Sequence, residues 1–125
     1  MSVMKRVRLE LARDPEYPAG SHHHGYEFAA PLDDEGRIDA AEWKKQRERC
    51  RVRRFWGDES DEVGHIIHRP GGGWAFHYDI HGRGEGDESG FRFDKHAFKP
   101  GEYVSIREHD GVLRTFRVMA VSDLD

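Results

Sequence analysis

The sequence predicts a mainly β protein of the α+β type: a small antiparallel β-barrel, or a strongly bent sheet, of about seven strands with one amphipathic helix. Apolar and polar residues alternate through most segments, which is typical of strands with one buried face. Gly- and Pro-rich turns separate these segments, and only one stretch carries helix signals. The chain has 125 residues, so we expect a single domain, residues 1–125.

The first two strands follow from this alternation. Residues 3–11 form the first expected strand, with Val7 and Leu9 on the inner face and charged residues between them. After a Pro-Ala-Gly break, a second strand is expected at residues 26–32, and the acidic turn at residues 33–36 ends it.

The only helix is expected from Ala40 to Cys50. Asp39 can cap its first turn, and Glu42 sits three residues later, as in a capping box. Ile38 and Trp43 have the spacing of a hydrophobic staple. Because its apolar stripe is narrow, we expect this helix to lie over one opening or one face of the sheet.

The second half of the chain continues the strand pattern. The expected elements are strands at 51–56, 63–69 and 74–80, a flexible Gly-rich loop at 82–90, a short strand at 91–93, and a hairpin at 99–121 that turns at Asp110-Gly111. We expect these side chains in the core: Val7, Leu9, Phe28, Trp43, Phe76, Tyr78, Val104, Ile106, Phe116 and Val118.

Composition narrows the class of protein. The net charge of −4 is modest, and three Trp, four Tyr and seven Phe supply large apolar side chains for a core. No apolar run approaches the ~20 residues that cross a bilayer, and the N-terminus lacks a signal-peptide pattern. We therefore expect a cytoplasmic protein that does not insert into a membrane.

The segment WAFHYDIHG contains a candidate metal site. On a strand, His77, Asp79 and His81 share one face, and His68 joins them if the preceding turn places it opposite Ala75. Such ligands suit zinc, iron, manganese or nickel, or, with a distal histidine, the facial triad of a non-haem iron oxygenase. The alternative is the solvated face of an ordinary strand. The cofactor therefore stays open between a divalent transition metal and none.

A basic run is the second candidate. It contributes Lys44, Lys45, Arg47, Arg51, Arg53 and Arg54, and it is followed by Phe55 and Trp56. Cations beside aromatics on a small barrel favour single-stranded nucleic acid. The alternative is a solvated or protein-facing surface, paired with the acidic loops at residues 58–62 and 85–88.

The single cysteine, Cys50, permits no internal disulfide, which is typical of a reducing compartment. Neighbouring arginines favour a reactive thiolate, whereas a place on the buried stripe beside Trp43 favours an inert thiol. The chain contains no nucleophile elbow, phosphate loop or zinc-protease motif.

Two resemblances concern the second half. The segment FKPGEYVSI (98–106) resembles the PGQYV strand of the flavin-binding barrel in ferredoxin reductases, but Arg114-Thr115-Phe116-Arg117 lacks that family's serine. The order of its Pro-Gly turn, strand residues and Asp-Gly turn also resembles that of PUA-like RNA-binding barrels. Residues 68–79 and 98–106 together resemble a family of short α-proteobacterial proteins with an HRPGG-x-WAFHYD centre and an F-x-PGEYVSI end. No activity is assigned to that family, so the resemblance implies no site residues.

The leading hypothesis is a non-enzymatic cytoplasmic binding or accessory module for an unknown protein or small-molecule partner, because charge is unevenly distributed and no complete catalytic set is visible. The alternatives are a metal-binding protein and a single-stranded nucleic-acid-binding barrel.

Overall fold

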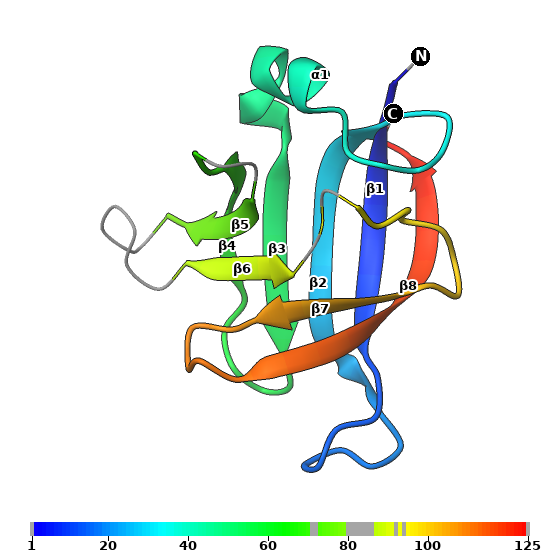
Figure 1. Cartoon of the computed structure of the whole chain (residues 1–125). Helices are drawn as coiled ribbons and strands as arrows, with labels where there is room; N and C mark the ends of the chain where they lie inside the picture. The colour runs from blue at the N-terminus through cyan, green and yellow to red at the C-terminus, as the bar shows by residue number, and fades with distance from the viewer. Residues whose placement is uncertain (1, 71–72, 80–86, 92, 94, 125) are drawn as a thin grey trace.

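Eight antiparallel strands form a closed barrel in which each strand pairs with its sequence neighbour and β8 closes on β1 (Figure 1). The computed structural model describes residues 2–70, 73–79, 87–91, 93 and 95–124. The strands are β1 (Val3–Leu11), β2 (Ser21–Leu32), β3 (Arg51–Trp56), β4 (Glu62–His68), β5 (Trp74–Tyr78), β6 (Glu88–Phe91), β7 (Tyr103–Arg107) and β8 (Leu113–Asp123). This confirms the predicted fold class, with eight strands rather than about seven.

The helix is shorter than the sequence predicts. Helix α1 spans Ala40–Lys45, and the Asp39 side chain caps it by accepting a hydrogen bond from the Glu42 N–H at 3.1 Å. The expected extension to Cys50 is wrong, because Gln46 leaves the helical region at φ −126° and a single 3₁₀ turn, η1 (Arg47–Arg49), follows. This tighter turn brings the chain into β3 within a few residues.

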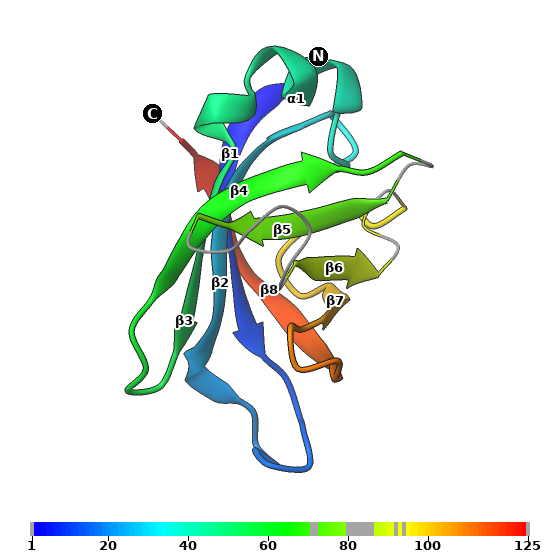
Figure 2. The ribbon, with the colours of Figure 1, turned by 90° about the vertical axis from the view of Figure 1, so that its left-hand side faces the viewer.

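One end of the barrel carries α1 and both chain termini, whereas the β1–β2 and β3–β4 loops lie at the other end (Figures 1 and 2). This places the helix at one opening, which is one of the two expected positions. No described helix has the length and apolar character needed to span a bilayer.

The barrel interior is filled by aromatic side chains. The rings of Phe28, Phe76, Phe93 and Phe98 pack with centroids 5.1–6.4 Å apart, mostly in tilted or edge-to-face pairs. All ten side chains expected in the core are buried. The alternation of residues therefore identifies these inward positions correctly. On β1 it fails only at the start, where Val3 is 47% exposed and Met4 is buried.

Strand β6 falls where the sequence predicts a loop. Residues Glu88, Ser89 and Gly90 pair with β5, and residues Ser89, Gly90 and Phe91 pair with β7, so β6 closes the gap between these strands. The expected short strand at 91–93 is displaced, because Phe93 lies in a turn and its ring packs over Gly90. A Cβ at position 90 would lie only 2.4 Å from that ring, so glycine is required by the close approach.

Candidate functional site

The register of the β4–β5 hairpin differs by one residue from the expected one. His65 lies opposite His77, Ile67 opposite Ala75, and His68 opposite Trp74. The prediction that His68 faces Ala75 is therefore wrong, because the turn is longer and closes with a hydrogen bond from the Arg69 N–H to the Gly73 carbonyl at 2.7 Å. His68 stacks instead on the Trp74 ring, with centroids 4.1 Å apart.

The other expected metal ligands have protein partners. The His77 Nδ1 lies 2.6 Å from the Asp87 carboxylate, and Asp79 pairs with Arg51 at 3.2 Å and with His65 at 3.6 Å. His81 lies outside the described residues. Within the described part of the chain, no group of three or more His, Cys, Asp or Glu residues is placed to hold a metal ion.

The basic run does not form one continuous surface. Lys44, Lys45 and Arg47 are exposed on α1 and the turn that follows it. On β3, Arg51 pairs with Asp79, and Arg53 pairs with Asp61 and Glu27 at 2.8 and 3.3 Å. Arg54 is directed into the barrel and is only 6% exposed, so its expected place in a nucleic-acid-binding stripe is wrong.

A hollow of about 450 Å³ lies where η1 and α1 meet the outer face of β4 and β5. We call it the helix-side pocket. It is lined by Trp43, Arg47, Glu48, His65, Ile66, Ile67, His68, His77 and Asp87. A concave, largely apolar lining with a few convergent polar groups is the usual form of a small-molecule site.

The apolar wall of this pocket is rigidly held. The Trp43 indole donates a hydrogen bond to the Ile66 carbonyl at 3.0 Å, which fixes the helix on β4. Its ring also meets Trp74 edge-to-face, with centroids 5.3 Å apart. The guanidinium of Arg47 lies 4.9 Å from the Trp43 ring centroid and forms part of the rim.

The polar wall is a histidine oriented by a carboxylate. The Asp87 side chain is only 4% exposed, and it accepts from both His77 and Arg69. Arg69 in turn donates to Ser89 at 3.0 Å, so the carboxylate is held from two sides. Nδ1 of His77 is occupied, and no described residue hydrogen-bonds its Nε2. The Nε2 atom is therefore left for a ligand: it is an acceptor when the ring is neutral and a donor when the ring is doubly protonated.

The sequence identifies His68 and His77 as candidate metal ligands and Arg47 as part of a basic run, but it does not predict that they line one pocket. On β4, His65 and Ile67 lie on either side of the buried Ile66, so their alternation with it indicates that they face outward. Once the register with β5 is known, this pattern places both residues beside His77. Asp87 carries no comparable signal, because it lies in a stretch predicted to be a loop.

A second cluster, buried inside the barrel, is polar. The interior polar network consists of Tyr26, Arg54, Tyr78, Glu88 and Glu108. The Tyr26 hydroxyl contacts Glu88 and Glu108 at 2.8 and 2.6 Å, Tyr78 donates to Glu88 at 2.6 Å, and Arg54 reaches Glu108 at 3.2 Å. Burial raises the pKa of Glu88, against the hydrogen bond from Tyr78 and the charge of Arg54.

Arg114 connects this network to the loops at the end of the barrel opposite α1. It donates to Glu108 at 2.8 Å, to Asp110 at 3.2 Å and to Glu16 at 2.9 Å. The β1–β2 loop, the β7–β8 turn and the interior are thereby joined through one guanidinium. Since Tyr26, Tyr78, Glu88 and Glu108 are at most 2% exposed, we assign the network to holding the strands rather than to binding.

Cys50 is also a structural residue. It is fully buried, and its thiol donates to the Gln46 carbonyl at 3.3 Å. Burial raises the pKa of the thiol to about 11, against the positive charge of Arg49. This contradicts the reactive-thiolate interpretation and supports the inert one.

No protein-family model, curated protein or solved structure matches this chain. The resemblance to short α-proteobacterial proteins therefore stays a prediction.

Proposed function

We propose that this protein is a binding module whose helix-side pocket takes a small ligand with a flat apolar body and one hydrogen-bond donor. The observation that carries the proposal is the pairing of His77 with the nearly buried Asp87 beside the apolar wall of Trp43 and Ile67. A single oriented polar group in an otherwise apolar hollow is suited to fixing the direction of a ligand.

The chemistry of the ligand follows from the two walls. The Trp43 and Ile67 side chains favour a ring that can lie against them. With His77 neutral and its Nδ1–H donated to Asp87, the free Nε2 accepts a hydrogen bond from a hydroxyl or ring N–H on that ligand. A ligand lacking this donor would leave the Nε2 lone pair desolvated and without a partner.

A cytoplasmic location belongs to the same proposal. Its support is Cys50, the only cysteine of the chain, which is a buried free thiol and not part of a disulfide.

Indole and N-methylindole form a matched pair of probes, because only indole carries the ring N–H. Their affinities can be measured by following the Trp43 side-chain and β4 amide signals in NMR titrations. We expect indole to bind with a Kd of about 1 mM or tighter, and N-methylindole to bind about tenfold more weakly, owing to the unpaired acceptor.

Variants locate the interaction. His77→Ala should abolish the difference between the two probes, and Asp87→Asn should reduce it by disturbing the orientation of the imidazole. His22→Ala is the control, because this histidine is highly exposed and lies on β2, away from the pocket. Equal affinities of indole and N-methylindole for the unmodified protein would show that His77 does not select the ligand.

A further inference from the structure

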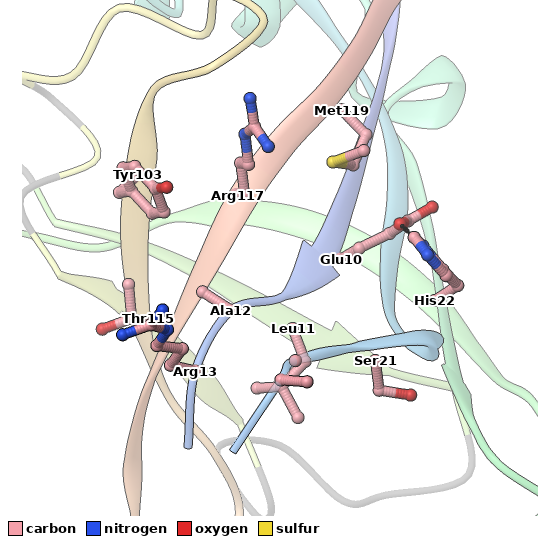
Figure 3. Close-up of a pocket in the computed structure, with 12 residues that line it drawn as sticks. Glu10, Leu11, Ala12, Arg13, Ser21, His22, Tyr103, Thr115, Arg117 and Met119 are labelled. Carbon is pink, nitrogen blue, oxygen red and sulfur yellow. Dashed lines mark hydrogen bonds and ion pairs between the residues drawn. The ribbon is translucent and has the colours of Figure 1, made fainter. Parts of the chain in front are cut away.

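A second hollow, of about 710 Å³, lies on the outer wall of the barrel, where the β1–β2 loop meets β7 and β8. We call it the wall groove. Figure 3 shows its lining: Tyr103 on β7, a row of side chains on β8, and Glu10 and His22 beyond them. The strands that form it are different from those of the helix-side pocket, so the two sites are independent.

Arg117 lies at the centre of the wall groove, with its charge unused by neighbouring carboxylates. It is directly opposite Tyr103 on β7 and opposite Glu10 on β1. The Glu10 carboxylate is already bound by Arg8 at 2.8 Å. It is also bound by His22 at 2.6 Å, as Figure 3 shows. Among the described residues, no hydrogen bond or ion pair reaches the Arg117 guanidinium.

The charge of Glu10 is therefore neutralised within its own cluster. Although partial burial opposes it, hydrogen bonds from Arg8 and His22 lower the pKa of Glu10, which keeps this carboxylate ionised and committed to them. The carboxylate that the strand register places opposite Arg117 is thus unavailable to it.

A second cation and a hydroxyl lie beside Arg117. Thr115 is two residues before it on β8, about 7 Å along the same face. The Ala12 N–H donates to the Thr115 carbonyl at 3.0 Å, and this bond brings Arg13 next to Thr115 (Figure 3). Arg13 is exposed and has no ion-pair partner among the described residues. The Thr115 hydroxyl already contacts the Ser105 hydroxyl at 3.3 Å, so the donors left for a ligand are the two guanidinium groups, which suit a phosphate.

Apolar surface flanks these donors on both sides. The Tyr103 side chain is 54% exposed, and Met119, two residues after Arg117 on β8, is 37% exposed. Exposed aromatic rings of this kind stack on nucleobases, and neighbouring cations contact the phosphate of the same nucleotide. Since Tyr103 and Arg117 are cross-strand neighbours, with Cβ atoms about 5 Å apart, one nucleotide can contact both.

We propose that the wall groove binds a nucleoside phosphate, with the phosphate on Arg117, the base against Tyr103, and Arg13 adding a second positive charge to the groove. The same chemistry is offered by a free mononucleotide and by the phosphorylated end of a single-stranded nucleic acid. This site is distinct from the run Lys44–Arg54, in which the sequence alone suggested nucleic-acid binding.

The experiment compares adenosine monophosphate, adenosine and a short phosphorylated oligothymidine by NMR titration of the intact chain. We expect adenosine monophosphate to bind with a Kd of about 1 mM or tighter and adenosine to bind at least about tenfold more weakly, because the charge-assisted bonds to phosphate are lost. An oligothymidine that binds much more tightly than the mononucleotide identifies a nucleic acid as the source; equal affinities identify a free nucleotide.

Arg117→Gln is the decisive variant, and Arg6→Gln is its matched control. Both residues are exposed arginines, so each change removes one positive charge, but Arg6 lies outside the wall groove. We expect Arg117→Gln to weaken phosphate binding by about ten- to hundredfold and Arg6→Gln to change it little. Equal weakening by the two variants, equal binding of adenosine, or no binding of either phosphate probe overturns the proposal.

Discussion

Replacing Arg54 by methionine tests whether the interior polar network holds the barrel together. The guanidinium is 6% exposed and lies 3.2 Å from Glu108, 3.6 Å from Glu88 and 4.2 Å from the Trp56 ring centroid. Methionine fills much of the same volume but leaves the charge of two buried carboxyl groups poorly compensated. Breaking a buried ion pair in this way costs about 3–5 kcal/mol of unfolding free energy.

For a chain of this size, that loss corresponds to a fall in Tm of about 10–20 °C. The effect has a defined pH dependence. Without Arg54, the already raised pKa of Glu88 rises further, so the protonated carboxyl is favoured in the folded state. A group with a raised pKa stabilises the folded state at acidic pH, and this stabilisation is lost as pH rises. The loss of unfolding free energy in Arg54→Met should therefore be larger at about pH 7 than at about pH 4.

The assay is urea denaturation followed by circular dichroism at both pH values. Arg53→Met is the control: it is the adjacent residue on β3, but it points outward and makes two surface ion pairs with Glu27 and Asp61. Such pairs contribute less than about 1 kcal/mol each. If Arg54→Met destabilises the protein no more than Arg53→Met does, the buried network does not have the role assigned to it.

Three further changes test other parts of the structure. Gly64→Ala should lower the free energy of unfolding by more than about 2 kcal/mol, because its Cβ would lie 1.9 Å from the His77 carbonyl oxygen. Gly73→Ala, with open space around the new Cβ, should change it by no more than about 0.5 kcal/mol in the same thermal or urea unfolding assay, and similar losses in the two variants would refute the close approach of β4 and β5. Cys50 should react with a thiol-specific aromatic disulfide far more slowly in the native than in the urea-unfolded protein at neutral pH, and rapid native labelling would contradict its burial. Burial, followed by the charges of nearby cations, lowers the pKa of His24, so stability should fall as pH decreases from about 7 to about 5, and a slope unchanged in His24→Gln would exclude this histidine as the cause.

The alternation of residues predicts the barrel because it reports directly on burial. Val7, Leu9 and Phe116 alternate with polar neighbours on their strands, and each faces the interior. Strand β6 shows the limit of this signal. Its residues Glu88, Ser89 and Gly90 have low strand propensity, and they form a strand only because β5 and β7 pair with them.

The candidate site depends on two facts that local sequence does not carry. One is the length of the β4–β5 turn, because it sets the register of the two strands. A shift of one residue pairs His68 with Trp74 instead of Ala75 and places His65 opposite His77. The other is a contact over ten residues, between His77 and Asp87. The interior polar network escapes prediction for the same reason, because Tyr26 and Glu108 are 82 residues apart.

Imidazole nitrogen NMR of the native protein during an indole titration tests the proposed binding site most directly. We predict that Nδ1 of His77 carries a proton held by Asp87, and that indole shifts the Nε2 resonance to saturation, whereas N-methylindole at the same concentration does so only weakly. A His77 whose Nε2 resonance does not change with indole, or changes equally with both probes, would contradict the assignment of the helix-side pocket as the binding site.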